Sequence, residues 1–112
     1  MADCLFCRIV AKEIPAQVVA ETEECLAFRD ISPQAPTHVL VIPKTHIPSL
    51  SSPNATIVMA LIAKMAKEVA SAEGIADSGY RFVVNTGDDG GQSVHHLHAH
   101  VLGGRAMHWP PG

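Results

Sequence analysis

The sequence is poor in basic residues and has no long hydrophobic run. Lysine and arginine together number 8 among 112 residues, they are scattered, and the formal net charge is −3. A surface that binds a nucleic-acid duplex normally carries a clustered basic patch, so we expect no nucleic-acid partner. No window approaches the length needed to cross a bilayer, and residues 1–7 lack the basic and apolar segments of a secretory leader. We therefore expect a soluble, cytoplasmic protein with no membrane partner.

Cysteine is also scarce. The three cysteines are Cys4, Cys7 and Cys25, and an odd number without a secretory signal argues for thiols or metal ligands instead of a disulfide framework. Cys4 and Cys7 form a Cys-x-x-Cys pair, which by itself fits a redox pair or two buried thiols. Two further ligands would make it a metal site. Cys25 lies within a predicted strand, so we interpret it as a packing residue.

The length of 112 residues fits one small domain, near the size at which extra burial, for example by dimerisation, helps stability. We interpret residues 1–112 as a single domain in which 103–112 form a C-terminal tail. Trp109, followed by two prolines, predicts that this tail is stiff, partly apolar and docked.

The apolar pattern predicts two helices. The first spans residues 5–12 and ends before Pro15, because the residue preceding proline avoids the helical region. The second begins at Ser52 and Pro53, with the serine as N-cap, and ends at Gly74. Its core face is predicted to contain five apolar residues: Val58, Leu61, Ile62, Met65 and Val69.

Five segments are predicted strands: 17–21, 25–29, 38–43, 80–85 and 94–102. Residues 32–36 and 86–93, rich in proline or glycine, are predicted loops. Together the elements predict an α+β fold with a mainly antiparallel sheet of about five strands, one short helix and one long helix.

Residues 94–102 alternate histidines with small apolar residues. Because every second side chain of a strand points the same way, three histidines should line one face about 7 Å apart: His96, His98 and His100. The residues between them should face a core: Leu97, Ala99 and Val101. A solvated histidine tract would lack these apolar partners, and a metal site would need a further ligand. We interpret the histidine row as a chemically active surface.

Residues 96–102, His-Leu-His-Ala-His-Val-Leu, match the signature of the histidine triad (HIT) superfamily of nucleotide hydrolases and transferases. Four more segments resemble its Hint branch, the histidine triad nucleotide-binding proteins: 25–38, 41–46, 90–93 and 103–112. The resemblance covers nearly the whole chain and implies a HIT-like fold. His100, where glutamine would stand in the hexose-phosphate uridylyltransferase branch, favours the hydrolase branches.

The resemblance implies roles for the residues around the triad. His98 would attack the α-phosphorus and carry the nucleotidyl group until water removes it, because a neutral imidazole is a good nucleophile at pH 7. His100 is the natural donor to the phosphoryl oxygens. Ser93 and the amides near Gly91 and Gln92 would add donors, and the region of Ser93 would protonate a leaving amine.

Nucleoside recognition needs a carboxylate for the ribose hydroxyls and an apolar slot for the base. Asp30 is the candidate carboxylate. The other candidate substrate contacts are Leu5, Phe6, Ile9, Phe28, Ile31, Asn85, Val94 and Trp109. Several of these apolar residues could equally be plain core, and such a slot would prefer purines without distinguishing adenine from guanine. His38 would either order the hydrogen bonds of the triad or be a satisfied histidine at the core edge.

The resemblance also implies a structural zinc and a homodimer, with no cofactor for catalysis. The zinc ligands would be Cys4, Cys7, His46 and His96, since two thiolates and two neutral imidazoles give a neutral tetrahedral site. In the dimer the sheet continues across a two-fold axis, and each tail brings Trp109 to the leaving-group side of the partner's active site.

The leading interpretation is a purine nucleoside phosphoramidase that hydrolyses P–N bonds of AMP or GMP phosphoramidates, such as AMP-lysine, through a nucleotidyl-His98 intermediate. A dinucleoside polyphosphate hydrolase of the same superfamily is an alternative. A nucleotide-binding regulatory or interaction module with incidental catalysis is another, and a metal or redox protein centred on Cys4 and Cys7 is the third.

Overall fold

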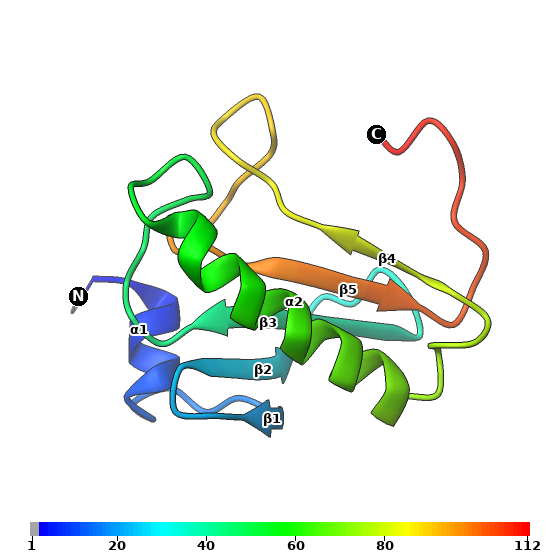
Figure 1. The fold of residues 1–112 in the computed structure, drawn as a ribbon, viewed down its shortest axis with the longest axis horizontal. Helices are drawn as coiled ribbons and strands as arrows, with labels where there is room; N and C mark the ends of the chain where they lie inside the picture. The colour runs from blue at the N-terminus through cyan, green and yellow to red at the C-terminus, as the bar shows by residue number, and fades with distance from the viewer. Residues whose placement is uncertain (1–2) are drawn as a thin grey trace.

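The computed structural model describes residues 3–112, which form two helices and one five-stranded sheet (Figure 1). The elements are, in order, α1 (Leu5–Val10), β1 (Val18–Glu21), β2 (Cys25–Arg29), β3 (Thr37–Pro43), α2 (Ala55–Ala72), β4 (Tyr80–Val83) and β5 (Ala99–Gly103). The sheet order is β1-β2-β3-β5-β4 and all neighbouring strands are antiparallel. The predicted α+β class, the five strands, and the pairing of one short with one long helix are confirmed.

Both faces of the central strands are covered. In β2, Cys25 and Ala27 belong to the core that α2 completes, whereas Leu26 and Phe28 pack with Phe6 of α1. Alternate side chains therefore enter two different cores, and the continuous apolar run of β3 is buried throughout for the same reason. Figure 1 shows α2 lying across one face of the sheet. The other face is covered by α1, whose six residues are too few to span five strands.

Helix α2 begins at Ala55, so the predicted start at Ser52 is wrong. Its N-cap is Asn54, with φ +67° and no side-chain capping bond. The Ser52 hydroxyl instead accepts a hydrogen bond from the backbone N–H of Ser49 at 3.1 Å. Because its hydroxyl is hydrogen-bonded within the preceding turn, Ser52 does not act as the N-cap, and the helix begins at Ala55.

The core face and the end of α2 agree with the pattern except at one position. Ile62, Met65 and Val69 are buried, but Leu61 is 38% exposed, and the small residues Ala66 and Ala70 are buried instead. Gly74 has φ +75°. Its N–H and that of Ile75 donate to carbonyls of the last helical turn at 3.2 and 3.0 Å, which is the Schellman ending that favours glycine.

Strand β5 begins only at Ala99, so the predicted extension back to Val94 is wrong. His96 and His98 precede the strand. Here the Leu97 N–H donates to the carbonyl of Ile47 at 2.6 Å, and the His96 ring bonds the carbonyl of Pro43 at 2.8 Å. Because this segment bonds the end of β3 and the loop after it without a regular ladder, His96 and His98 lie outside the strand that carries His100, although Leu97, Ala99 and Val101 face the core as predicted.

Other element ends shift by one to two residues. Helix α1 ends at Val10 because Lys12 adopts φ +63°, and β4 ends at Val83. Neither described helix is both long and apolar enough to cross a membrane.

Candidate active site

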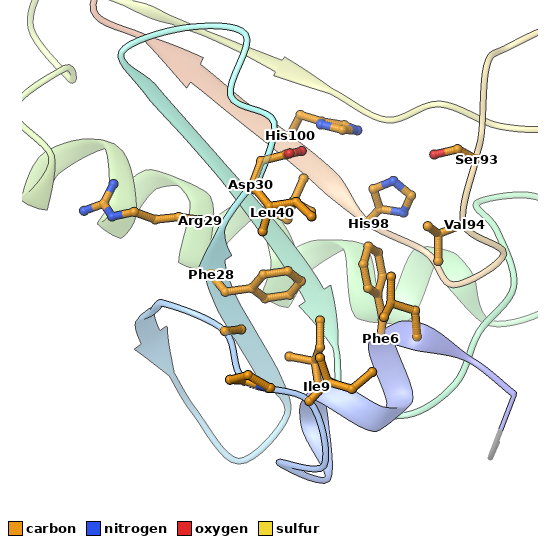
Figure 2. Close-up of a pocket in the computed structure, with 15 residues that line it drawn as sticks. Phe6, Ile9, Phe28, Arg29, Asp30, Leu40, Ser93, Val94, His98 and His100 are labelled. Carbon is orange, nitrogen blue, oxygen red and sulfur yellow. The ribbon is translucent and has the colours of Figure 1, made fainter.

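A cleft of about 330 Å³ opens on the sheet face that α1 leaves uncovered (Figure 2). Most predicted site residues line it: Leu5, Phe6, Ile9, Phe28, Asp30, Ile31, Ser93, Val94, His98 and His100. Three further parts of the chain also line the cleft and were not predicted from the sequence: Arg29, Leu40 and the segment 14–16. Leu40 could have been predicted as a cleft residue from the sequence, because it lies two residues from His38 on the same face of a predicted strand.

Five predicted site residues do not line this cleft: His38, Asn85, Gly91, Gln92 and Trp109. Trp109 is 83% exposed. The buried amide of Gln92 holds its own loop together, since it accepts from the Gly87 N–H at 3.0 Å and donates to the carbonyls of Pro48 and Val94. The substrate contacts predicted for these residues stay predictions.

One end of the cleft is aromatic. The rings of Phe6 and Phe28 meet edge to face with centroids 5.5 Å apart, and the Phe6 ring stands at 88° to the His98 ring at 5.1 Å. Such edge contacts orient both rings. Phe6 thus forms part of an apolar slot and also restrains the ring of His98.

The hydrogen bond of His98 determines its tautomer. Its Nδ1 lies 2.7 Å from the backbone oxygen of His96, and the side chain is buried. A carbonyl oxygen can only accept, so Nδ1 carries the hydrogen and Nε2 carries the lone pair. The ring therefore has a free nucleophilic nitrogen beside the rings of Phe6 and His100.

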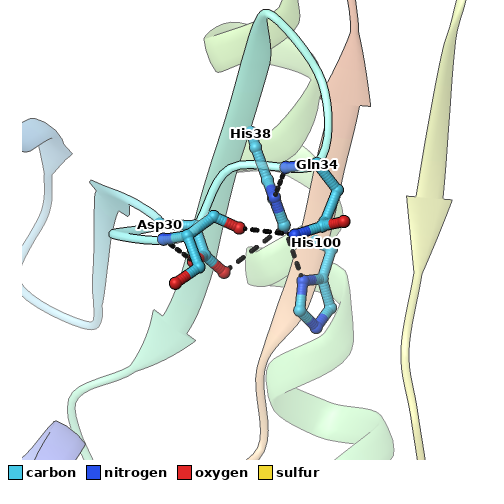
Figure 3. Close-up of polar contacts among 5 residues, drawn as sticks. Asp30, Gln34, His38 and His100 are labelled. Atoms are coloured by element: carbon cyan, nitrogen blue, oxygen red, sulfur yellow. Dashed lines mark hydrogen bonds and ion pairs between the residues drawn. The ribbon is translucent and has the colours of Figure 1, made fainter.

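A second chain of hydrogen bonds determines the tautomers of His38 and His100 (Figure 3). The backbone N–H of Gln34 donates to His38 Nδ1 at 3.0 Å, so the hydrogen of a neutral His38 is on Nε2. That Nε2 lies 2.9 Å from His100 Nδ1, which must then accept. The hydrogen of His100 is consequently on its own Nε2, a buried atom with no partner among the described residues. A buried donor without an acceptor is costly, so this N–H is suited to an incoming ligand oxygen.

His100 and His38, the two histidines of this hydrogen-bond chain, are neutral at pH 7 because their pKa values are lowered. Burial lowers the pKa of His100 to about 4, and nearby His98 and His38 act in the same direction. Burial also lowers the pKa of His38, against the opposing effect of Asp30, whose Oδ2 is 3.4 Å from His38 Nε2. The donor that His100 offers is therefore an uncharged imidazole N–H.

Asp30 follows directly after β2 and places a carboxylate at the cleft wall. Its Oδ1 accepts the backbone N–H of Ser32 at 2.8 Å, which orients the group. The preceding residue, Arg29, forms a two-bond ion pair with Glu73 of the α2 C-cap, at 2.7 and 3.0 Å. The end of β2 is thus tied to α2, and the carboxylate of Asp30 remains an acceptor for ligand hydroxyls.

The four predicted metal ligands come together next to the cleft. The ligand atoms of Cys4, Cys7, His46 and His96 all lie within 4.8 Å of one another. Cys4 Sγ and Cys7 Sγ are each 3.3 Å from an imidazole Nδ1, that of His96 and that of His46 respectively. Burial raises the pKa of Cys7, and the Cys4 thiol acts in the same direction.

The orientation of His96 fits a metal. Its Nε2 lies 2.8 Å from the carbonyl oxygen of Pro43, so Nε2 carries the hydrogen and the Nδ1 lone pair faces the thiols. Histidine ligands are commonly held by such a bond from the second ring nitrogen. Two sulfur and two nitrogen donors form the set that Zn²⁺ prefers at structural sites.

A second group, Asp30, His38 and His100, also has ligand atoms within 4.8 Å of one another. A metal there would need the lone pair of His38 Nε2, which would move the hydrogen to Nδ1. Nδ1 already accepts from the Gln34 N–H at 3.0 Å, so the two hydrogens would clash. This group is built to hold a proton between two rings and not a metal ion.

The comparisons with known proteins all point to one family. The sequence model of the HIT domain matches residues 11–107. An uncharacterised HIT-like protein of Synechococcus elongatus is 49% identical, over 98% of this chain and 97% of that protein. The crystal structure of a HIT family hydrolase from Legionella pneumophila Philadelphia 1 has a TM-score of 0.94 and 53% identity, over 98% of this chain and 100% of that chain. The structure of a histidine triad nucleotide-binding protein from Candida albicans has a TM-score of 0.84 and 30% identity, over 96% of this chain and 83% of that chain.

Proposed function

This chain belongs to the HIT family and resembles its hydrolases, and on that premise we propose that it is a purine nucleoside phosphoramidase. The observation that carries the proposal is the pairing of a free lone pair on His98 Nε2 with an unpartnered N–H on His100 Nε2 in one cleft. A nucleophile beside a fixed donor is what displacement at a phosphoryl centre requires.

The reaction has two displacement steps. His98 Nε2 attacks the α-phosphorus, the N–P bond forms, and the P–N bond to the amine breaks. The leaving nitrogen takes a proton, for which the Ser93 hydroxyl at the cleft wall is the proposed donor. Water then attacks the phosphorus and gives up one proton, which restores the Ser93 hydroxyl, the His98–phosphorus bond breaks, and a nucleoside monophosphate is released. In both steps the N–H of His100 donates to a phosphoryl oxygen.

The cleft next to these histidines suits a purine nucleoside. The carboxylate of Asp30 can accept from two ribose hydroxyls. The rings of Phe6 and Phe28, with Ile9 beside them, supply the apolar slot. A purine buries more area in such a slot than a pyrimidine does, and nothing in the slot distinguishes AMP from GMP derivatives.

The test is intact-mass spectrometry of the native protein after a rapid, acid-free quench with an AMP phosphoramidate. We expect the mass to rise by one AMP group, and His98→Ala to abolish both the adduct and amine release. His95→Ala is the matched control, since His95 is an exposed neighbouring histidine. Cleavage of a diadenosine polyphosphate but not of the phosphoramidate would contradict the proposal in favour of a polyphosphate hydrolase. Nucleotide binding without any turnover would contradict it in favour of a binding module.

We also propose that Cys4, Cys7, His46 and His96 hold a structural zinc ion, which would link the start of α1 to the segment before β5. The donor set and the direction of the His96 Nδ1 lone pair support this. His96 also accepts the Nδ1 hydrogen of His98 through its backbone oxygen, so a metal that fixes His96 would help to orient the nucleophile. Reduced thiols of this kind are stable in the cytoplasm, where we expect the protein to act.

A homodimer is the proposed assembly. β4 is an edge of the sheet, and its Tyr80 and Phe82 are 36% and 38% exposed. With Ala63, Ala66 and Lys67 of α2 they line a shallow, mostly apolar hollow. Edge strands with exposed apolar residues favour pairing with a second chain. The tail leaves the sheet at the end opposite α1 (Figure 1), so Trp109 would serve a partner's site, not that of its own chain.

A further inference from the structure

The start of the C-terminal tail is fastened to the loop between β2 and β3. Arg105 donates from Nε and from its second terminal nitrogen to the backbone oxygen of Gln34, at 3.2 and 3.0 Å. Its other terminal nitrogen donates to the carbonyl of Ala106 at 2.9 Å. One guanidinium thus holds both the loop and the tail, in the forked geometry that lysine lacks.

Close packing supports the same contact. Gly104, immediately before Arg105, has φ +90°, and a Cβ there would lie 2.9 Å from Cβ of Pro36 in the loop. Only glycine accommodates both that backbone conformation and that approach. The tail therefore meets the loop at two adjacent residues, Gly104 and Arg105, and the loop is held at Gln34 and Pro36.

Gln34 connects this contact to the cleft. Its carbonyl accepts from Arg105, and its N–H donates to His38 Nδ1 at 3.0 Å (Figure 3). Its side-chain amide also donates to the carbonyl of Ser32 at 2.9 Å. The Gln34 N–H and C=O lie in successive peptide planes that meet at one Cα, so a displacement of Gln34 away from Arg105 would also shift its N–H relative to His38 Nδ1.

We infer that Arg105 is a positioning residue that, through Gln34, holds His38 and His100 in the tautomers that present an N–H to the cleft. The Gln34 N–H donates to His38 Nδ1 and so excludes a hydrogen from that nitrogen. The Asp30 carboxylate oxygen, 3.4 Å from His38 Nε2, favours the same tautomer, but at a distance too long for a strong hydrogen bond. If that hydrogen moves to Nδ1, His100 Nδ1 loses its donor and the His100 N–H can turn away from the ligand. The catalytic consequence rests on the proposed function, whereas the tautomers can be observed without any substrate.

The experiment compares Arg105→Met with the native protein by long-range ¹H–¹⁵N imidazole NMR and by steady-state kinetics. Arg81→Met is the matched control, because Arg81 also donates to a tail carbonyl, that of His108 at 2.8 Å, but does not contact the loop. We expect Arg105→Met to raise the share of Nδ1-protonated His38, and Arg81→Met to leave both rings unchanged. Loss of a charge-assisted bond to the loop should lower kcat about tenfold with less effect on KM, and Arg105→Lys should restore part of the loss.

Unchanged His38 and His100 tautomers in Arg105→Met would overturn the inference. An equal tautomer change in Arg81→Met would also overturn it, since a general loosening of the tail would then be the cause. If the tautomers shift as expected but native protein does not cleave phosphoramidates, the positioning role stands and the proposed function fails.

Discussion

Replacing His100 by glutamine should make the protein less sensitive to acid. The pKa of His100 falls from an ordinary value of 6.5 to about 4 in the folded protein, chiefly through burial. Between these two values the unfolded chain binds a proton that the folded protein does not bind. The free energy of unfolding therefore rises with pH across this window, and the stability present above pH 6.5 is lost as the pH falls toward 4.

The size of the effect follows from the two pKa values. From pH 7 to pH 5 this one residue should lower the free energy of unfolding by about 2 kcal/mol. In His100→Gln that contribution is absent. The cost of a changed contact in the buried site is the same at both pH values, so it cancels when the pH-dependent differences are compared.

Urea unfolding of both proteins at pH 7 and pH 5 measures this difference. We expect the drop between the two pH values to be about 2 kcal/mol smaller in His100→Gln than in the native protein. His108→Gln, at an exposed position, should behave as the native protein does. Any loss of the proposed metal at pH 5 should affect all three proteins alike. An equal drop in native protein and His100→Gln would refute the assignment of a neutral His100 with a lowered pKa.

Three further predictions test other parts of the molecule. Zn²⁺ at a hundred times its Kd should stabilise metal-stripped protein by about 2.7 kcal/mol, seen as a higher Tm; Cys7→Ala should abolish the rise and Cys25→Ala should retain it. Gly103→Ala should lower the free energy of unfolding by about 1–3 kcal/mol, because its Cβ would lie 2.6 Å from Cδ1 of Ile75; Gly112→Ala, with no atom within 4 Å, should be neutral in urea unfolding. Phe82→Glu should convert the proposed dimer to a monomer in sedimentation, and a native protein that is already monomeric would contradict the assembly.

The elements that the sequence predicted well are those whose signal is local. The apolar run of β3 and the spacing of Ile62, Met65 and Val69 in α2 reflect strand and helix periodicities, which require only neighbouring residues. Gly74 marked the helix end because a left-handed residue is needed there. Ser52 failed as an N-cap because its hydroxyl is used in a turn with Ser49, a competition that the pattern does not reveal.

The amino-acid sequence by itself determined the antiparallel α+β fold, the presence of a histidine triad and the residues available for a cleft. Only the tertiary structure decided how these residues act. It brought Cys4 and Cys7 to His46 and His96, and it started the regular strand β5 only after His98. It also determined which nitrogen of each ring carries the hydrogen, because a tautomer depends on which donor or acceptor lies opposite each nitrogen. Those partners are distant in sequence or lie in irregular segments, so no local pattern specifies them.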